Sequence, residues 1–261
     1  MVKAIFLGTG SAGGSPRLGH TDQQCLAARK SGSKTARRRS SLFVDENGVK
    51  LLIDAGPDVL AQLADAHIEK IDAVMLTHAH SDAAGGLRLL NSWLAKRRLV
   101  VPLFALAGAF AKLDIGRLKQ FNPTPLVPGQ RIFIGSADIL PFRVVHGIRL
   151  KTPTVGFRID GLVYASDMES ALPASYKIMR RACVLVIDGT FWDKKSLPGH
   201  MTVVEAIALA ERLCPDQLFL TQIGHAYPPH EEAQKKIAAF VKRKGVPFPV
   251  RLAYDGLGFS I

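Results

Sequence analysis

Leu76-Thr77-His78-Ala79-His80-Ser81-Asp82-Ala83-Ala84-Gly85-Gly86-Leu87 is the most informative stretch of this 261-residue chain. It follows an apolar run, residues 71–76, that predicts a buried strand. His78 and His80 alternate by two, so both imidazoles point the same way if the chain is still extended there. Asp82 continues the series as the chain enters a helix. Because imidazole plus carboxylate is a usual ligand set for borderline divalent metals, the stretch predicts a metal site at a strand end.

The composition is that of a soluble globular protein, with 48% hydrophobic and 21% charged residues. There is no apolar run of about 18 residues, and residues 1–8 read as a strand without signal-peptide features, so we expect no membrane association and a cytoplasmic location. The three cysteines are far apart, and disulfides are not expected. A net charge of +12 favours anionic partners, either phosphorylated small molecules or nucleic acid.

Short apolar runs that end in an aspartate recur along the chain, which predicts buried strands that deliver carboxylates to one rim of a sheet. These aspartates are Asp54, Asp167, Asp188 and Asp255. Helical patterns lie between the runs, at residues 57–66, 87–97, 202–213 and 229–244, and Thr202 with Glu205 forms a capping box at the start of the third. Strands and helices alternate without a linker-like segment, so we expect one domain over residues 1–261.

A glycine-rich loop follows the first predicted strand. Gly8, Gly10 and Gly13 match the G-x-G-x-x-G pattern of dinucleotide-binding loops. However, the residues that follow are polar and interrupted by Pro16, and no helical pattern begins at the loop. We therefore interpret these glycines as allowing a tight backbone path beside a cleft.

Further candidate ligands stand at the ends of later strands. His146 ends an apolar strand at residues 142–146, and Asp167 ends another. With His78 and His80 they make a complete set for one divalent cation, with water as a further ligand; such a cation could also serve stability alone. His200 precedes a helix start and is either a loop histidine or an acid/base group, because its unperturbed pKa lies near neutrality.

The His78-x-His80-x-Asp82 run resembles the His-x-His-x-Asp-His signature of the metallo-β-lactamase superfamily. The resemblance implies an α/β fold, an αββα sandwich of two mixed β-sheets flanked by helices, with the site at strand ends between the sheets. The glycine loop, His146-Gly147, Gly199-His200 and residues 221–225 extend the resemblance over nearly the whole chain. It is nearest to the phosphoribosyl cyclic phosphodiesterases of the carbon-phosphorus lyase pathway.

The chain departs from that family at the second metal site. Ala83 stands where the family has its second-site histidine, and Gln222 replaces the first histidine of Leu-Thr-His-x-x-His. The carboxylates Asp82 and Asp167 remain, so we expect one Zn or Mn ion in the active site. The second position is expected to be empty, or to hold a hard cation weakly through Asp82 with Gln222. Asp82 is also a candidate catalytic residue.

A second cluster resembles the structural zinc loop of the same subfamily, Gly-Cys-x-Cys-x-x-Cys, whose three cysteines join the last histidine of the His-x-x-His motif. Here the corresponding residues are His20, Asp22, Cys25 and His225. This mixed nitrogen, oxygen and sulfur set could still hold a structural zinc ion, with lower affinity than three thiolates.

The resemblance implies a metal-dependent hydrolase acting on a phosphodiester, either small and cyclic or nucleotide-like. Metal-bound hydroxide would be the nucleophile and His200 the general acid that protonates the leaving oxygen. Arg37, Arg38 and Arg39, which precede the strand pair ending in Asp54, would neutralise phosphate oxygens. Two alternatives stay open: a catalytically weakened, metal-containing binding protein for a phosphorylated ligand, and an RNA-processing nuclease. We also expect a homodimer.

Overall fold

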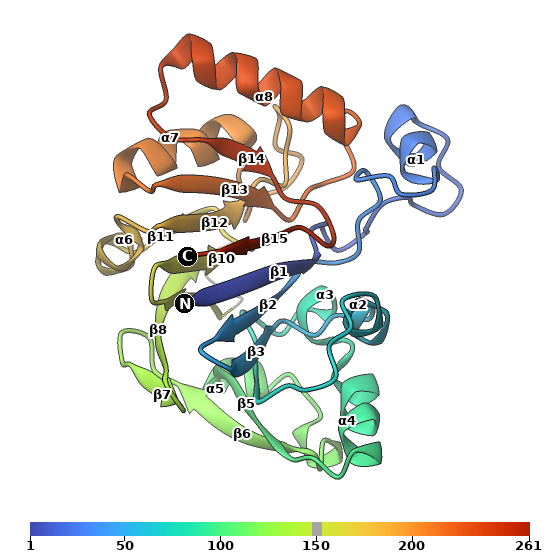
Figure 1. Ribbon diagram of the computed structural model, residues 1–261, viewed down its shortest axis with the longest axis vertical. Coiled ribbons are helices and arrows are strands. Elements are labelled where there is room, and N and C mark those ends of the chain that lie inside the picture. Colours follow the sequence, from blue (N-terminus) through green and yellow to red (C-terminus); the bar gives the residue numbers. More distant parts are fainter. Residues whose placement is uncertain (148–152) are drawn as a thin grey trace.

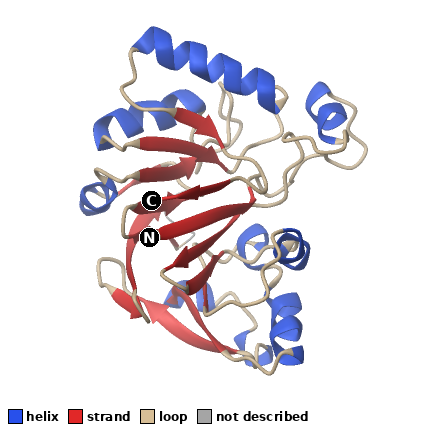
Figure 2. Ribbon diagram, in the orientation of Figure 1, coloured by secondary structure: helices blue, strands red, loops and turns tan. Residues whose placement is uncertain are grey.

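The strands of the computed structural model, which describes residues 1–147 and 153–261, form two mixed sheets that face each other across a shared apolar core (Figures 1 and 2). The first sheet has the order β15 (Gly258–Ser260), β1 (Val2–Gly8), β2 (Ser41–Glu46), β3 (Val49–Ile53), β4 (Ala73–Met75), β5 (Val101–Leu106) and β6 (Phe121–Leu126). The second has the order β11 (Ser170–Ala171), β8 (Ala137–Val145), β9 (Thr154–Ile159), β10 (Leu162–Ala165), β12 (Val184–Asp188), β13 (Gln217–Thr221) and β14 (Val250–Leu252), with β7 (Ile132–Ile134) paired to β8.

Both sheets are built to the same plan. Apart from β15, which pairs antiparallel with β1, the strands of each sheet that come first in the chain pair antiparallel and the later ones pair parallel, with the change at β3 and β4 in the first sheet and at β10 and β12 in the second. Parallel strands begin at one edge and end together at the opposite edge, so the residues that follow β4, β10 and β12 gather on one rim. That rim carries the polar residues described below.

Most helices cover the outer faces of the two sheets, whereas the first lies in the long connection between β1 and β2, apart from both sheets (Figure 1). The helices are α1 (Gln23–Ala28), α2 (Val59–Asp65), α3 (Ser81–Ala84), α4 (Leu87–Lys96), α5 (Ala107–Phe110), α6 (Pro173–Met179), α7 (Val203–Leu213) and α8 (His230–Lys244), with a short 3₁₀ turn at Ile115–Arg117. Apolar residues of α2 and α4 join the core of the first sheet, and those of α6, α7 and α8 pack on the outer face of the second. The predicted αββα sandwich is confirmed.

The alternation of side chains explains why the inner strands are apolar throughout. In β12, Val184 and Val186 face the core between the sheets, while Leu185 and Ile187 face the outer helices. A strand buried on both faces has no position for a polar residue until it ends. The first polar residue of this strand is Asp188, at its carboxyl end, and it is fully buried.

The predicted helices are found within two residues of their expected ends, and the Thr202–Glu205 capping box starts α7. The predicted strand at residues 71–76 is shorter, Ala73–Met75, because the next residues bond elsewhere: the Thr77 amide donates to the Asp54 carboxylate at 2.8 Å. Across the two described ranges, no helix combines the length and apolar character needed to span a bilayer.

The glycine loop is a backbone connector, as interpreted from the sequence. Gly10 pairs with Arg39 on one side and with Ile223 on the other, so the loop joins residues that precede β2 to residues that follow β13. The chain after this loop does not enter a helix until Gln23. The geometry of a dinucleotide-binding loop, which needs a helix opening directly at the glycines, is therefore not present there.

Candidate active site

Side chains from five separate strand ends meet at the carboxyl rim of the two sheets. We call His78, His80, His146 and Asp167 the strand-end cluster. Their ligand atoms lie within 4.8 Å of one another in overlapping groups: His78, His80 and His146; His146, Asp167 and His200; His78, Asp82 and Asp167. A cavity of about 680 Å³ opens over these groups. The structure thus brings together the residues that the sequence singled out, and their role as metal ligands stays a prediction.

His78 is oriented by the residue before it. The Thr77 hydroxyl donates to the Asp54 carboxylate at 2.9 Å, so it accepts from His78 Nδ1 at 2.8 Å. This fixes the proton on Nδ1 and leaves a lone pair on Nε2. That Nε2 is buried and has no hydrogen-bond partner among the residues described. Burial lowers the pKa of His78 to about 3, which keeps the ring neutral, as metal binding requires.

His146 is fixed by the loop that precedes α7. Its Nδ1 donates to the Gly199 carbonyl at 2.9 Å, so its Nε2 faces the cluster, 3.4 Å from His80 Nδ1. Gly199 has a φ of +100°, and a Cβ there would lie 2.4 Å from the Gly147 nitrogen. Only glycine can therefore present this carbonyl to His146. Ligand histidines held through their second nitrogen in this way are typical of metal sites.

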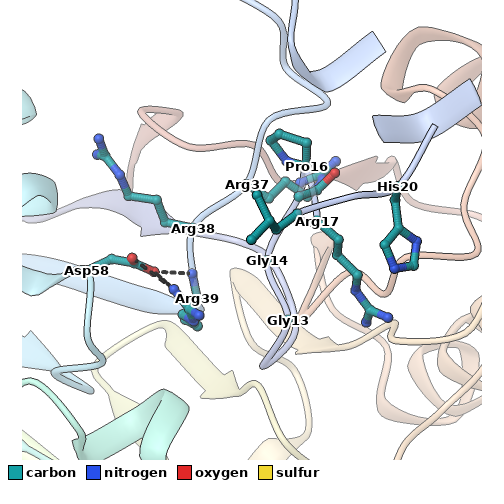
Figure 3. Close-up of a pocket in the computed structure, with 11 residues that line it drawn as sticks. Gly13, Gly14, Pro16, Arg17, His20, Arg37, Arg38, Arg39 and Asp58 are labelled. Carbon is teal, nitrogen blue, oxygen red and sulfur yellow. Dashed lines mark hydrogen bonds and ion pairs between the residues drawn. The ribbon is translucent and has the colours of Figure 1, made fainter. Parts of the chain in front are cut away.

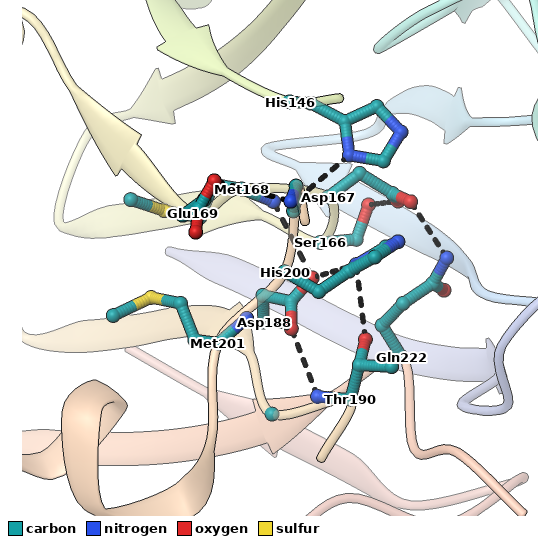
Figure 4. Close-up of polar contacts among 12 residues, drawn as sticks. His146, Ser166, Asp167, Met168, Glu169, Asp188, Thr190, His200, Met201 and Gln222 are labelled. Carbon is teal, nitrogen blue, oxygen red and sulfur yellow. Dashed lines mark hydrogen bonds and ion pairs between the residues drawn. The ribbon is translucent and has the colours of Figure 1, made fainter. Parts of the chain in front are cut away.

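Gln222 occupies the position of the missing second-site histidine. Its amide nitrogen donates to Asp167 at 2.7 Å and to Asp82 at 3.3 Å, so an N–H group bridges the two carboxylates (Figure 4). Burial, followed by the charge of Asp167, raises the pKa of Asp82. Burial alone would raise the pKa of Asp167 as well, but the neighbouring histidines, His78 first, bring it below its usual value. The residues present therefore fit one cation next to Asp167.

His200 sits beside this cluster with its own carboxylate. Its Nδ1 lies 2.5 Å from Asp188 Oδ2 and 3.0 Å from the Thr190 hydroxyl (Figure 4). Its ring stands 4.8 Å from the His146 ring, measured between centroids. Burial would lower the pKa of His200, but the hydrogen bond and charge of Asp188 raise it to about 9. The imidazole is thus protonated at neutral pH and holds a proton at the cavity.

His20, Asp22, Cys25 and His225, which we call the loop cluster, also converge, with ligand atoms within 4.8 Å of one another. His225 Nε2 lies 3.1 Å from Cys25 Sγ and 3.0 Å from Asp22 Oδ2. A backbone hydrogen bond from Cys25 lowers the pKa of Asp22 to about 2, and desolvation lowers that of His225. Carboxylate and neutral imidazole are the forms that bind zinc. The cluster fits the structural zinc ion implied by the resemblance.

The structure does not bring the three predicted phosphate-binding arginines to the active-site cavity. Arg37 is buried, with its guanidinium bonded to Thr9, the Ala253 carbonyl and His230. Arg38 pairs with Asp65 at 2.7 Å and Arg39 with Asp58 at 3.0 Å (Figure 3). The cationic side chains that do line the cavity are Arg17 and Lys194, which the sequence did not single out.

Asp188 is a second functional residue that sequence reasoning did not assign. The signal was present, because Asp188 ends an apolar run in the same way as Asp167. Its pairing with His200, twelve residues later, depends on the path of the loop between them and has no local signature. Asp54 was likewise seen as a strand-end carboxylate, without its hydrogen bonds to Thr77.

Comparisons with known proteins agree with this fold. A family model described as the beta-lactamase superfamily domain matches residues 50–223. Ribonuclease Z of Methanopyrus kandleri is 35% identical, covering 82% of this chain and 92% of that protein. A crystal structure described as a new diphosphatase from the PhnP family is 28% identical with a TM-score of 0.86, covering 99% and 96% of the two chains. An octanoyltransferase of Porphyromonas gingivalis is 26% identical over 98% of this chain, which spans only 51% of that relative.

Proposed function

This chain belongs to the β-lactamase superfamily and is a hydrolase of the metallo-β-lactamase fold, and from that premise we propose that it is a phosphodiesterase that works with one metal ion. The observation that carries the proposal is the buried Nε2 of His78, which has no hydrogen-bond partner among the described residues and lies with His80 and His146 in a group that could hold a metal ion. Two similar proteins are a diphosphatase and a ribonuclease, whose names point to hydrolysis at phosphorus. The family favours an enzyme over a binding protein.

The strand-end cluster would hold the cation, Zn or Mn by its ligand chemistry. A divalent cation at this position supplies a water molecule that can be deprotonated near neutral pH. Gln222 contributes by holding Asp82 and Asp167 together, in place of a second cation. Asp167 thereby stays aimed at the cluster, and Asp82 is free to accept a hydrogen bond from the water that attacks.

His200 supplies the proton for the second half of the reaction. When the bond between phosphorus and the leaving oxygen breaks, that oxygen gains negative charge and must be protonated. The Asp188 carboxylate orients the His200 ring through Nδ1, so Nε2 carries the other proton. His200 lines the cavity, and the proton on Nε2 would pass to the leaving oxygen.

The direct test is hydrolysis of bis(p-nitrophenyl) phosphate by purified protein with zinc or manganese, together with elemental analysis. We expect His200→Ala to lower kcat by about 10²–10⁴ while the metal content stays the same. His80→Ala should lose both the active-site metal and the activity. His67→Asn, at an exposed histidine outside the site, is the control. Protein with one bound metal ion that hydrolyses no diester would contradict the proposal.

The single-ion site has a separate test. The double variant Ala83→His with Gln222→His restores two imidazoles and removes the amide that bridges the carboxylates. We expect active-site metal content to rise from one ion to two, measured in a Cys25→Ser background that weakens the loop cluster. Two ions in the parent would contradict the role given to Gln222.

A second candidate is an RNA-processing nuclease. It is favoured by the 35% identity to a ribonuclease Z and by the net charge of +12. In that case the protein should cleave transfer RNA precursors, and the binding constant should fall steeply as salt rises. Weak, salt-insensitive RNA binding would leave the small phosphodiester as the substrate class.

A further inference from the structure

We infer that Arg17 binds the nonbridging oxygens of the substrate phosphate, and that Gly13 is the wall residue that lets the guanidinium reach them. The inference rests on the proposed function, because it names the group that recognises the substrate of the same site. It also replaces the arginines that the sequence suggested for this task, Arg37, Arg38 and Arg39.

Arg17 stands on a wall shared by two cavities. It lines the active-site cavity together with His80, Asp167 and His200, and it also lines a neighbouring cavity of about 490 Å³. Figure 3 shows the Arg17 side chain on the opposite side of the glycine loop from Arg39. Arg17 is therefore the arginine of this region that reaches the cavity holding the strand-end cluster.

Its guanidinium is not neutralised by a carboxylate. Arg39 bonds to Asp58 and Arg38 to Asp65, whereas Arg17 forms no ion pair within residues 1–147 and 153–261. The Arg17 Nε–H is buried and finds no acceptor in the described part of the chain. Burying an N–H group without an acceptor is unfavourable, and an anionic oxygen in the cavity would relieve this.

The chemistry of the cavity selects a phosphate as that anion. The guanidinium offers parallel N–H groups in a planar fork that matches two oxygens of one phosphate. The carboxylates of the cavity, Asp82 and Asp167, accept from Gln222 and form no ion pair with Arg17 within the described residues. A diester bound in this cavity could meet both Arg17 and the residues that would hold the cation.

The main chain of Arg17 is held in place by the loop cluster. Its backbone N–H donates to Cys25 Sγ at 3.3 Å, and its carbonyl accepts from Arg29 at 3.2 Å. The side chain lies against Gly13, where a Cβ would be 2.7 Å from Arg17 Nε and 2.8 Å from Nη2. An alanine at this position would displace the flexible end of Arg17 and leave its charge unchanged.

Two variants test the inference, Arg17→Gln and Gly13→Ala. We expect each to weaken the binding of inorganic phosphate to the zinc-loaded protein about tenfold, measured by isothermal titration calorimetry. Each should also lower kcat/KM for bis(p-nitrophenyl) phosphate, and Arg17→Lys should recover part of the loss. The matched controls are Arg251→Gln, an exposed arginine on β14, and Gly116→Ala, where a Cβ meets open space. Thermal unfolding checks that each variant is folded.

The outcomes separate this inference from the proposed function. If the parent hydrolyses the diester while Arg17→Gln keeps both its phosphate affinity and its kcat/KM, the inference is overturned and the proposed function stands. If the parent hydrolyses no diester but its phosphate affinity depends on Arg17 and Gly13, the inference is supported and the proposed function falls. If phosphate affinity falls in Arg17→Gln but not in Gly13→Ala, the role given to Gly13 is overturned.

Discussion

The strand-end cluster is the more buried of the two clusters. In it His78, His146 and Asp167 are buried and His80 is exposed, whereas in the loop cluster Cys25 is buried and His20 and Asp22 are exposed. The His78 side chain is 0% exposed, whereas those of His20 and Asp22 are 47% and 39% exposed. The first cluster is assembled from strand ends of both sheets, and the second from one short loop plus His225. Buried ligands on strands are fixed before any cation arrives, while exposed ligands on a loop are ordered largely by binding it.

The two clusters also differ in how they have changed relative to the family resemblance. In the strand-end region, Gln222 stands where the resemblance implies a second-site histidine, and its amide nitrogen donates to both Asp167 and Asp82. In the loop cluster, nitrogen and oxygen replace sulfur at solvent-accessible positions, where water can satisfy any unused atom. A substitution in the buried region therefore requires a new partner for the polar groups that remain, whereas a substitution in the exposed region does not.

The largest expected effect is on the free energy of unfolding, which should depend more on the strand-end region than on the loop cluster. Asp54 accepts from both the N–H and the hydroxyl of Thr77, and it has a φ of +63°. Asp54→Ala should therefore lower the free energy of unfolding of the metal-free protein by about 4 kcal/mol, measured by urea denaturation. Asp54→Asn, which keeps an acceptor and tolerates that φ, should cost far less. Asp22→Ala in the loop cluster is the counterpart, and an equal loss there would contradict the contrast.

A smaller loss of stability should appear on acidification, and it comes from His230. His230 Nδ1 accepts from Arg37 at 3.0 Å, and desolvation together with the Arg37 charge lowers the pKa of His230 to about 4. Its unfolded value is about 6.5, so below that pH the unfolded chain takes up a proton that the folded chain refuses. The free energy of unfolding should fall by about 2–3 kcal/mol between pH 6.5 and pH 4 from this group.

The control for that pH effect is His230→Gln, which keeps an acceptor for Arg37 but cannot titrate. Between pH 6.5 and pH 4 the free energy of unfolding of His230→Gln should fall by about 2–3 kcal/mol less than that of the parent. His67→Asn, at an exposed histidine, should follow the parent. Identical slopes for the parent and His230→Gln would show that His230 is not the group that titrates.

The smallest expected effect is on zinc affinity in the loop cluster. Replacing His20 and Asp22 by cysteine restores thiolates and should raise the affinity at least about tenfold, because zinc prefers sulfur ligands. Competition with a chromophoric chelator in a His80→Ala background measures the loop cluster alone. In the His80-containing protein, the affinity of the strand-end cluster should stay within about twofold. A change in zinc affinity at both clusters would mean that the two clusters are coupled.

The fold and the positions of the main ligands were predictable because their signals are local. Apolar runs that end in aspartate mark strands covered on both faces, and a Thr202–Glu205 pair marks a helix start. His78 and His80 are recognisable in the sequence because they alternate by two at the end of one predicted strand. The convergence of His146 and Asp167 on that pair came from the family resemblance, not from their own segments.

The sequence did not predict which of these arginines form ion pairs or buried hydrogen bonds, because their partners come from distant segments. This holds for Arg17 and for Arg37, Arg38 and Arg39. The three consecutive arginines looked available, yet Asp58, Asp65 and His230 engage them from elsewhere in the chain. Arg17 is isolated in sequence and forms no ion pair with any residue that the structure describes. Which cation is free to meet a ligand depends on the pairs that folding forms, and no spacing rule reveals them.

The Gly199 carbonyl joins two tasks in one peptide segment. It holds His146 in place, and the next residue is His200. A displacement of this turn would disturb a ligand and the proton donor in a single movement. On the proposed roles, this turn would couple the binding of the cation to the departure of the leaving group.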